Sequence, residues 1–147
     1  MSVQTGLYII TNKQMGMLIG QLPIEDKSLC PKCVCSLPQG IQPPRWEVQN
    51  NSSDYTMKIM RASVGAQDSV LFTFLIDEGA EQNKWSITPT PQHGPDIIEL
   101  ADRSAGWAVP SDDPETQLVV QPLISTKSLP PQYPASQLFT LIHIDRE

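Results

Sequence analysis

One lysine stands out in a short stretch that combines acids, a single base and two prolines. Residues 23–31 read Pro-Ile-Glu-Asp-Lys-Ser-Leu-Cys-Pro, and Lys27 is the only base among them. Proline fixes its own backbone φ angle and pushes the residue before it toward an extended conformation. Pro23 and Pro31 therefore predict an extended, stiffened loop that offers one long cation to a partner. Trypsin-like proteases select such a cation, because a carboxylate lies at the floor of their specificity pocket.

Taken alone, a single lysine in a surface loop is typical of an ordinary solvated charge. The two prolines that bracket Lys27 favour a functional loop, since they limit the conformations of the backbone between them. On these residues alone, both interpretations of Lys27 stay open.

Length and composition predict one compact domain over residues 1–147. Hydrophobic residues make up 39% of the chain, which is enough for a core, and the 14 prolines leave few windows for a long helix. The net charge of −6 and the lack of a basic stripe argue against binding to nucleic acid or to an anionic membrane. We expect a monomer without a cofactor.

The sequence contains no run of ~18 apolar residues that could span a membrane. Its first residues, Met-Ser-Val-Gln-Thr-Gly-Leu-Tyr, have neither a basic start nor an apolar run, so no signal peptide is predicted. We therefore expect a cytoplasmic protein.

The three cysteines are Cys30, Cys33 and Cys35. An odd number within so short a stretch is no disulfide framework and fits a reducing compartment. A zinc site would need a fourth ligand, and His93 and His143 are distant in the sequence, so no metal site is predicted. We expect Cys33 and Cys35 to be buried on one side of a strand, with a Cys30–Cys33 disulfide as the alternative.

Short apolar runs, rich in β-branched and aromatic residues, recur between turn-forming clusters and predict an all-β protein. Alternation is clearest where Tyr55, Met57 and Ile59 share one face of a strand. The stretch after Pro95 is ambiguous, since a proline in the first turn could also begin a short helix. The predicted strands span 7–11, 17–22, 32–37, 46–49, 55–60, 70–76, 85–88, 97–101, 107–109, 118–123 and 137–144.

These runs fall into three sets, each of which begins with a turn and an apolar strand and ends with a strand led by an aromatic residue. Similarity at a period of about 40–50 residues is typical of a repeat architecture. Three units of about four strands each predict a β-trefoil. The sets open at Gly6, Asp54 and Pro95, and the aromatic residues of their last strands are Trp46, Trp85 and Phe139.

Five motifs follow one another along the chain. They are Gly6-Leu-Tyr-Ile-Ile-Thr-Asn12, Glu25-Asp-Lys-Ser-Leu-x-Pro31-Lys32, Lys84-Trp85-Ser-Ile, Pro91-x-His93-Gly94 and Gly106-Trp107. Over most of the chain, this succession resembles the fungal β-trefoil serine protease inhibitors of the cospin type. The Glu-Asp-basic-Ser-Leu block and the Pro-x-His-Gly turn are its most specific parts. The resemblance implies a β-trefoil whose loop between the second and third strands carries a trypsin-reactive bond.

The resemblance also implies roles for individual residues. The base of the block, here Lys27, lies just before the reactive bond, which is then Lys27–Ser28. An asparagine in the first turn could brace this loop, although it is also typical of an ordinary turn. The residues expected on the acyl side are Ile24, Glu25 and Asp26, those on the leaving-group side are Ser28 and Leu29, and those that support the loop are Asn12, Pro23 and Pro31.

Two rival functions remain at this point. A carbohydrate-binding β-trefoil would need an acid or amide and an aromatic residue repeated in equivalent loops, and the chain shows no such triplication. Its tryptophans are interpreted as core residues rather than as exposed rings on which a sugar would stack. An inhibitor of another protease class could use a different loop, such as 38–45. No nucleophile–base motif is visible, so an enzyme is not expected.

Overall fold

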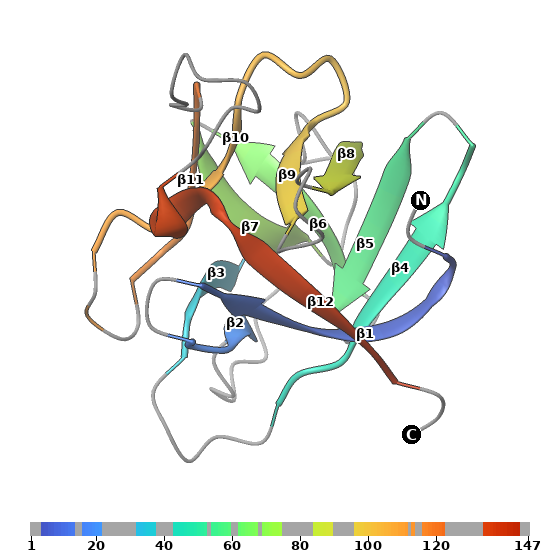
Figure 1. Ribbon diagram of the computed structural model, residues 1–147, viewed down its shortest axis with the longest axis horizontal. Coiled ribbons are helices and arrows are strands. Elements are labelled where there is room, and N and C mark those ends of the chain that lie inside the picture. The colour runs from blue at the N-terminus through green and yellow to red at the C-terminus, as the bar shows by residue number, and fades with distance from the viewer. Residues whose placement is uncertain are drawn as a thin grey trace.

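In the computed structural model, the regular secondary structure of the described residues is almost entirely β-strand (Figure 1). It describes residues 4–13, 16–21, 32–37, 43–52, 54–59, 62–67, 69–74, 84–89, 96–111, 113, 116–122 and 134–144. Within these ranges no helix is long and apolar enough to cross a membrane, and a 3₁₀ turn, Ala135–Gln137, precedes the last strand. The predicted all-β class is therefore confirmed. The strands are β1 (Gly6–Asn12), β2 (Ile19–Gln21), β3 (Lys32–Ser36), β4 (Trp46–Asn50), β5 (Tyr55–Ile59), β6 (Ala62–Gln67), β7 (Val70–Phe74), β8 (Trp85–Pro89), β9 (Asp96–Leu100), β10 (Gly106–Ala108), β11 (Val119–Gln121) and β12 (Phe139–Ile144).

Six of these strands form a closed ring. β1 pairs with β4, β4 with β5, β5 with β8, β8 with β9 and β9 with β12, and β12 returns to β1, antiparallel at every step. Figure 1 shows β1 and β12 running side by side across the molecule. Closure satisfies the backbone groups that an open sheet would leave unpaired at its edges.

The remaining strands form three hairpins, β2–β3, β6–β7 and β10–β11. The hairpins also contact one another, because β7 pairs with β3 at Cys33↔Phe72 and with β11 at Val119↔Val70. Each third of the chain contributes its first and fourth strands to the ring and its second and third strands to a hairpin. These thirds match the three sets of runs in the sequence.

Successive side chains of a strand point to opposite faces of the sheet, and this alternation determines which of them enter the core. In β5, Tyr55, Met57 and Ile59 are buried, whereas Lys58 is exposed on the opposite face. This confirms the period of two predicted for the segment. Burial of such apolar side chains contributes ~25 cal/mol per Å² and is the main favourable term in folding.

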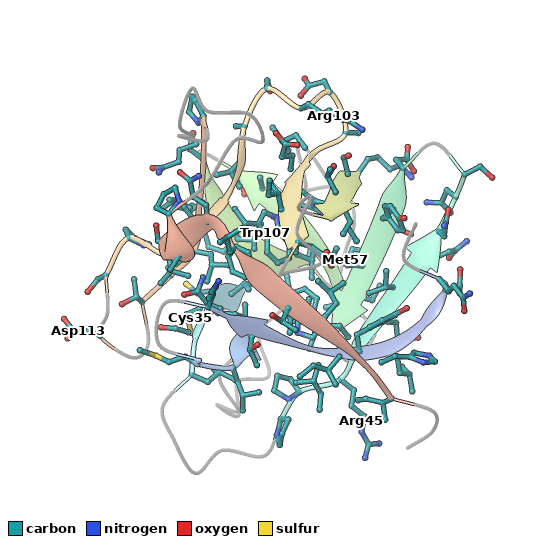
Figure 2. All side chains as sticks on the ribbon, in the orientation of Figure 1. Cys35, Arg45, Met57, Arg103, Trp107 and Asp113 are labelled. Atoms are coloured by element: carbon teal, nitrogen blue, oxygen red, sulfur yellow. The ribbon has the colours of Figure 1, made fainter. Side chains whose placement is uncertain are left out.

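Four aromatic rings meet inside the core. The centroid of the Trp107 ring, on β10, lies 5.6 Å from that of Trp46, 5.4 Å from Trp85 and 5.7 Å from Phe139. All four side chains are fully buried, and Figure 2 shows Trp107 deep among the strands. The aromatic residue that leads the last strand of each third therefore faces Trp107, and the interpretation of the tryptophans as core residues is confirmed.

One strand is missing from those predicted, and one predicted strand, 97–101, lies in a segment that could also have begun a helix. The predicted strands omit β6, which was wrong: Ala62-Ser-Val-Gly-Ala-Gln67 contains few β-forming residues, but β5 and β7 pair with it on its two edges. The ambiguous segment after Pro95 is strand β9, which pairs with β8 along its whole length. In both places pairing with neighbours decides the conformation that local preference leaves open.

Asp96, the first residue of β9, has a half-buried side chain, and burial raises the pKa of its carboxyl above the ordinary value. Ionisation of a group with a raised folded-state pKa opposes folding, and this cost disappears as the pH falls below the unfolded value of ~3.9. We therefore expect Asp96→Asn to raise the free energy of unfolding at neutral pH and to leave it unchanged at about pH 3. Urea unfolding of both proteins at the two pH values measures the difference.

Asp102 supplies a control of opposite sign. Its carboxylate accepts hydrogen bonds from the Ser104 hydroxyl at 2.7 Å and from the Ser104 N–H at 2.9 Å, and these lower the pKa of the Asp102 carboxyl. A lowered pKa stabilises the fold above the unfolded pKa, and the gain is lost as the pH falls through the folded value. Asp102→Asn should therefore destabilise the protein at neutral pH. If Asp96→Asn also lowered the free energy of unfolding at neutral pH, the role assigned to Asp96 would be wrong.

Candidate functional site

The segment that contains the predicted reactive bond joins β2 to β3. The structure describes both of its ends, since β2 ends at Gln21 and β3 begins at Lys32. Within this hairpin Gln21 pairs with Val34. The two strands therefore define the geometry at which the segment leaves and rejoins the fold. The segment itself, 22–31, lies outside the described residues, and with it Pro23, Ile24, Glu25, Asp26, Lys27, Ser28, Leu29 and Pro31.

β3, the outgoing strand, is held along both edges. One edge pairs with β2, and the first part of the other edge pairs with β7. Farther along that second edge, the Leu118 N–H donates to the Val34 carbonyl and the Ser36 N–H donates to the Thr116 carbonyl, each at 2.9 Å. A strand that is hydrogen-bonded on both sides can move only by breaking several of these bonds together.

Side chains add to the bonds on β3. Ser36 is 1% exposed, and its hydroxyl donates to the Asp113 carbonyl at 3.2 Å and accepts from the Thr116 N–H at 3.2 Å. The Thr116 hydroxyl donates to the same Asp113 carbonyl at 2.6 Å. Next to them, the Gln117 side-chain amide donates to the Leu71 carbonyl at 2.9 Å. The chain that leads into β11 is thereby fastened to β3 and β7 together.

β2, the incoming strand, has fewer backbone partners. Among the described residues Ile19–Gln21 pairs with β3 alone, and the residue before it forms an isolated bridge, Leu18↔Thr11. β2 is also the last strand in the order of the sheet. The incoming end of the segment therefore depends more on side-chain contacts than the outgoing end does.

β2 receives such contacts from Trp46, which opens β4, and from Pro44 just before it. The Trp46 Nε1–H donates to the Ile19 carbonyl at 2.9 Å. Pro44 packs directly on Gly20, where a Cβ atom would lie 2.4 Å from the Pro44 Cγ. Glycine at position 20 therefore leaves room for the proline ring against the strand.

Asn12, predicted to support the segment, is buried at the end of β1 with 2% exposure. Its side-chain amide donates to the carbonyls of Ala135 and Ser136 at 3.3 Å and of Leu138 at 3.2 Å. Its backbone N–H donates to the Met17 carbonyl at 2.9 Å and so closes the turn that leads to β2. Asn12 therefore ties this turn to the chain before β12, and its bond to the segment itself stays a prediction.

Cys33 and Cys35 lie on β3, and neither forms a disulfide in this structure. Cys35 is 2% exposed, but Cys33 is exposed, and the expectation that both are buried was wrong. The two share one face of the strand, but Cys33 lies nearer its end, where its partner Phe72 is itself only half-buried. In the part of the chain that the structure describes, no three His, Cys, Asp or Glu side chains gather as a metal site.

One exposed base lies in the turn between β9 and β10. Arg103 has a φ of 63°, in the left-handed region, and its N–H donates to the Leu100 carbonyl at 2.7 Å. Asp102 and Ser104 on either side of it are joined by hydrogen bonds. Figure 2 places Arg103 at the periphery, at the tip of a folded turn rather than in an extended segment.

Sequence reasoning missed the residues that hold the two ends of the segment. The hydrogen bonds of Ser36 reach 77 and 80 residues along the chain, and no local pattern reports partners so distant. The one available signal is Pro44, which lies in the predicted loop 38–45.

Comparison with known proteins adds independent observations. The model of the family Peptidase inhibitor I66 matches residues 1–143. A serine protease inhibitor from Lentinula edodes is 32% identical over 148 residues, which cover 98% of this chain and 100% of that protein. The solved structure of a proteinase inhibitor from Coprinopsis cinerea is 34% identical and has a TM-score of 0.89, over 97% of this chain and 100% of that one.

A more distant likeness concerns the fold alone. The ricin B-like lectin of Macrolepiota procera, solved in complex with lactose, is 15% identical and has a TM-score of 0.71, over 98% of this chain and 99% of that one. The family match spans nearly the whole chain, and that family consists of inhibitors rather than enzymes. The resemblance to fungal serine protease inhibitors is thus confirmed, and the chain belongs to the Peptidase inhibitor I66 family.

Proposed function

We propose that the chain is a reversible, substrate-like inhibitor of trypsin-like serine proteases, that its reactive bond is Lys27–Ser28, and that its fold is a β-trefoil. The closed six-stranded ring with one hairpin in each third of the chain supports the fold. Membership of a peptidase inhibitor family that includes a serine protease inhibitor supports the partner class. The observation that carries the site is the position of segment 22–31, between two strands that pair with each other.

Inhibition follows from the way in which such a segment meets the protease. The Lys27 ammonium enters the specificity pocket and meets its carboxylate, and the catalytic serine attacks the Lys27 carbonyl carbon. The bond to the Ser28 nitrogen breaks, and the amine leaves with a proton. If the same amine returns to the acyl-enzyme, the bond is restored, whereas attack by water completes hydrolysis. Paired strands on both sides keep the amine close, so resynthesis competes with hydrolysis.

The flanking residues complete the contact. Ile24, Glu25 and Asp26 lie before the bond and Ser28 and Leu29 after it. A loop held in its bound conformation loses less entropy when it docks. Complexes of this kind bury ~1,600 Å² and are among the tightest known.

A panel of proteases tests this function. We expect the protein to inhibit trypsin with a stoichiometry near one, in competition with a small lysine substrate, and to inhibit chymotrypsin and papain far less, since neither selects a cation. Inhibition of papain without inhibition of trypsin would contradict the proposal. That result would favour another loop such as 38–45, of which the structure describes 43–45.

A further inference from the structure

The two ends of the reactive segment are held in different ways, and resynthesis of the bond needs both. After cleavage the new amine belongs to the chain that enters β3, which is bonded along both edges. The acyl end belongs to the chain that leaves β2, which pairs with β3 alone among the described residues. The acyl end is therefore the one whose position depends on contacts outside the sheet.

We propose that Trp46 and Pro44 are positioning residues that hold this acyl end in place. The inference rests on the proposed function and deepens it. Neither residue touches the protease in this scheme. Both act through β2, and without them the cleaved chain would keep its fold but its acyl end would move away from the amine.

Trp46 can do this because it is itself fixed. Its side chain is fully buried, its backbone pairs with Tyr8 on β1 and with Ile59 on β5, and its ring packs against Trp107. The Nε1–H then reaches the Ile19 carbonyl on β2 at 2.9 Å. The indole thus connects the closed ring of strands to the strand that enters the segment.

Pro44 acts on the next residue of the same strand. Its ring lies against Gly20, which follows Ile19, so two consecutive residues of β2 are contacted from the chain that leads into β4. Because proline has a fixed φ, this contact does not depend on a flexible side chain. Pro44 and Trp46 therefore limit the movement of β2 away from β3.

The internal repetition of the fold offers a matched control. In the second third of the chain, the Trp85 Nε1–H donates to the Val64 carbonyl on β6 at 3.2 Å. Trp85 is also fully buried and also packs against Trp107. Trp85→Phe therefore removes the same atoms and the same kind of hydrogen bond as Trp46→Phe, but on a hairpin that carries no reactive bond.

The experiment compares wild type, Trp46→Phe and Trp85→Phe. Each is incubated with a catalytic amount of trypsin until the ratio of chain cleaved at Lys27–Ser28 to intact chain is constant, and mass spectrometry gives that ratio. We expect Trp46→Phe to raise the ratio about tenfold, which corresponds to ~1.4 kcal/mol, and Trp85→Phe to leave it unchanged. Urea unfolding should show similar losses of stability in both variants, so a general structural effect would not separate them.

Pro44→Ala is a second variant that leaves the indole in place, with Pro110→Ala, at an exposed proline after β10, as its control. It should raise the ratio in the same direction, and it decides the question if Trp46→Phe does not fold. Equal ratios for all variants, with trypsin still inhibited, would overturn the positioning role and leave the proposed function standing. A wild type that neither inhibits trypsin nor is cut at Lys27–Ser28 would overturn both.

Discussion

Lys27→Ala should weaken the binding of trypsin at least ~30-fold, because removal of one partner of a desolvated charge pair costs ~2–5 kcal/mol and each ~1.4 kcal/mol is a factor of ten. Lys27→Arg should keep tight binding, since the guanidinium also carries a positive charge into the pocket. Inhibition constants from titration of trypsin with the three proteins measure both effects.

Lys58→Ala is the matched control for this prediction. Lys58 is an exposed lysine on the outer face of β5, so its loss should leave the inhibition constant unchanged. A similar loss of affinity in both alanine variants would indicate general attraction between charges rather than one specific contact. Full inhibition by Lys27→Ala would remove Lys27 as the primary determinant.

The second large effect concerns stability. Trp107→Ala should lower the free energy of unfolding by ~3–5 kcal/mol, because it empties the place where the rings of Trp46, Trp85 and Phe139 converge. Trp107→Phe should cost much less. The Trp107 Nε1–H is buried and has no hydrogen-bond partner among the described residues, so phenylalanine removes an unpaired donor.

Urea unfolding followed by circular dichroism measures these differences without relying on tryptophan fluorescence. A loss below ~1 kcal/mol for Trp107→Ala would mean that the core closes around the missing ring. Equal losses for the alanine and phenylalanine variants would mean that a phenyl ring cannot replace the indole at this position.

Much of the fold could be predicted from local patterns. The alternation of Tyr55, Met57 and Ile59 is visible in the sequence and reappears as the buried face of β5. The aromatic residues Trp46 and Trp85 each open a strand of the closed ring, as their position at the end of each set suggested. Such features depend only on the order of apolar and polar residues, which the sequence displays directly.

The remaining features depend on neighbours that are distant along the chain. β6 is a strand because β5 and β7 lie on either side of it, although Ala62, Gly65 and Ala66 favour strands poorly. The exposure of Cys33 reflects where the core ends rather than the alternation of β3. Trp46 contacts β2 and Thr116 bonds to β3, and neither residue belongs to the motif that contains Lys27.

A protein that binds a protease also exposes its other surface peptide bonds to cleavage by that enzyme. Proteases bind their substrates as extended strands, and Arg103 could adopt that form only by leaving its φ of 63° and breaking its hydrogen bond to Leu100. The peptide bond after Arg103 should therefore resist cleavage while the turn stays folded. At Arg103 this protection comes from the shape of the backbone, because the side chain itself is exposed.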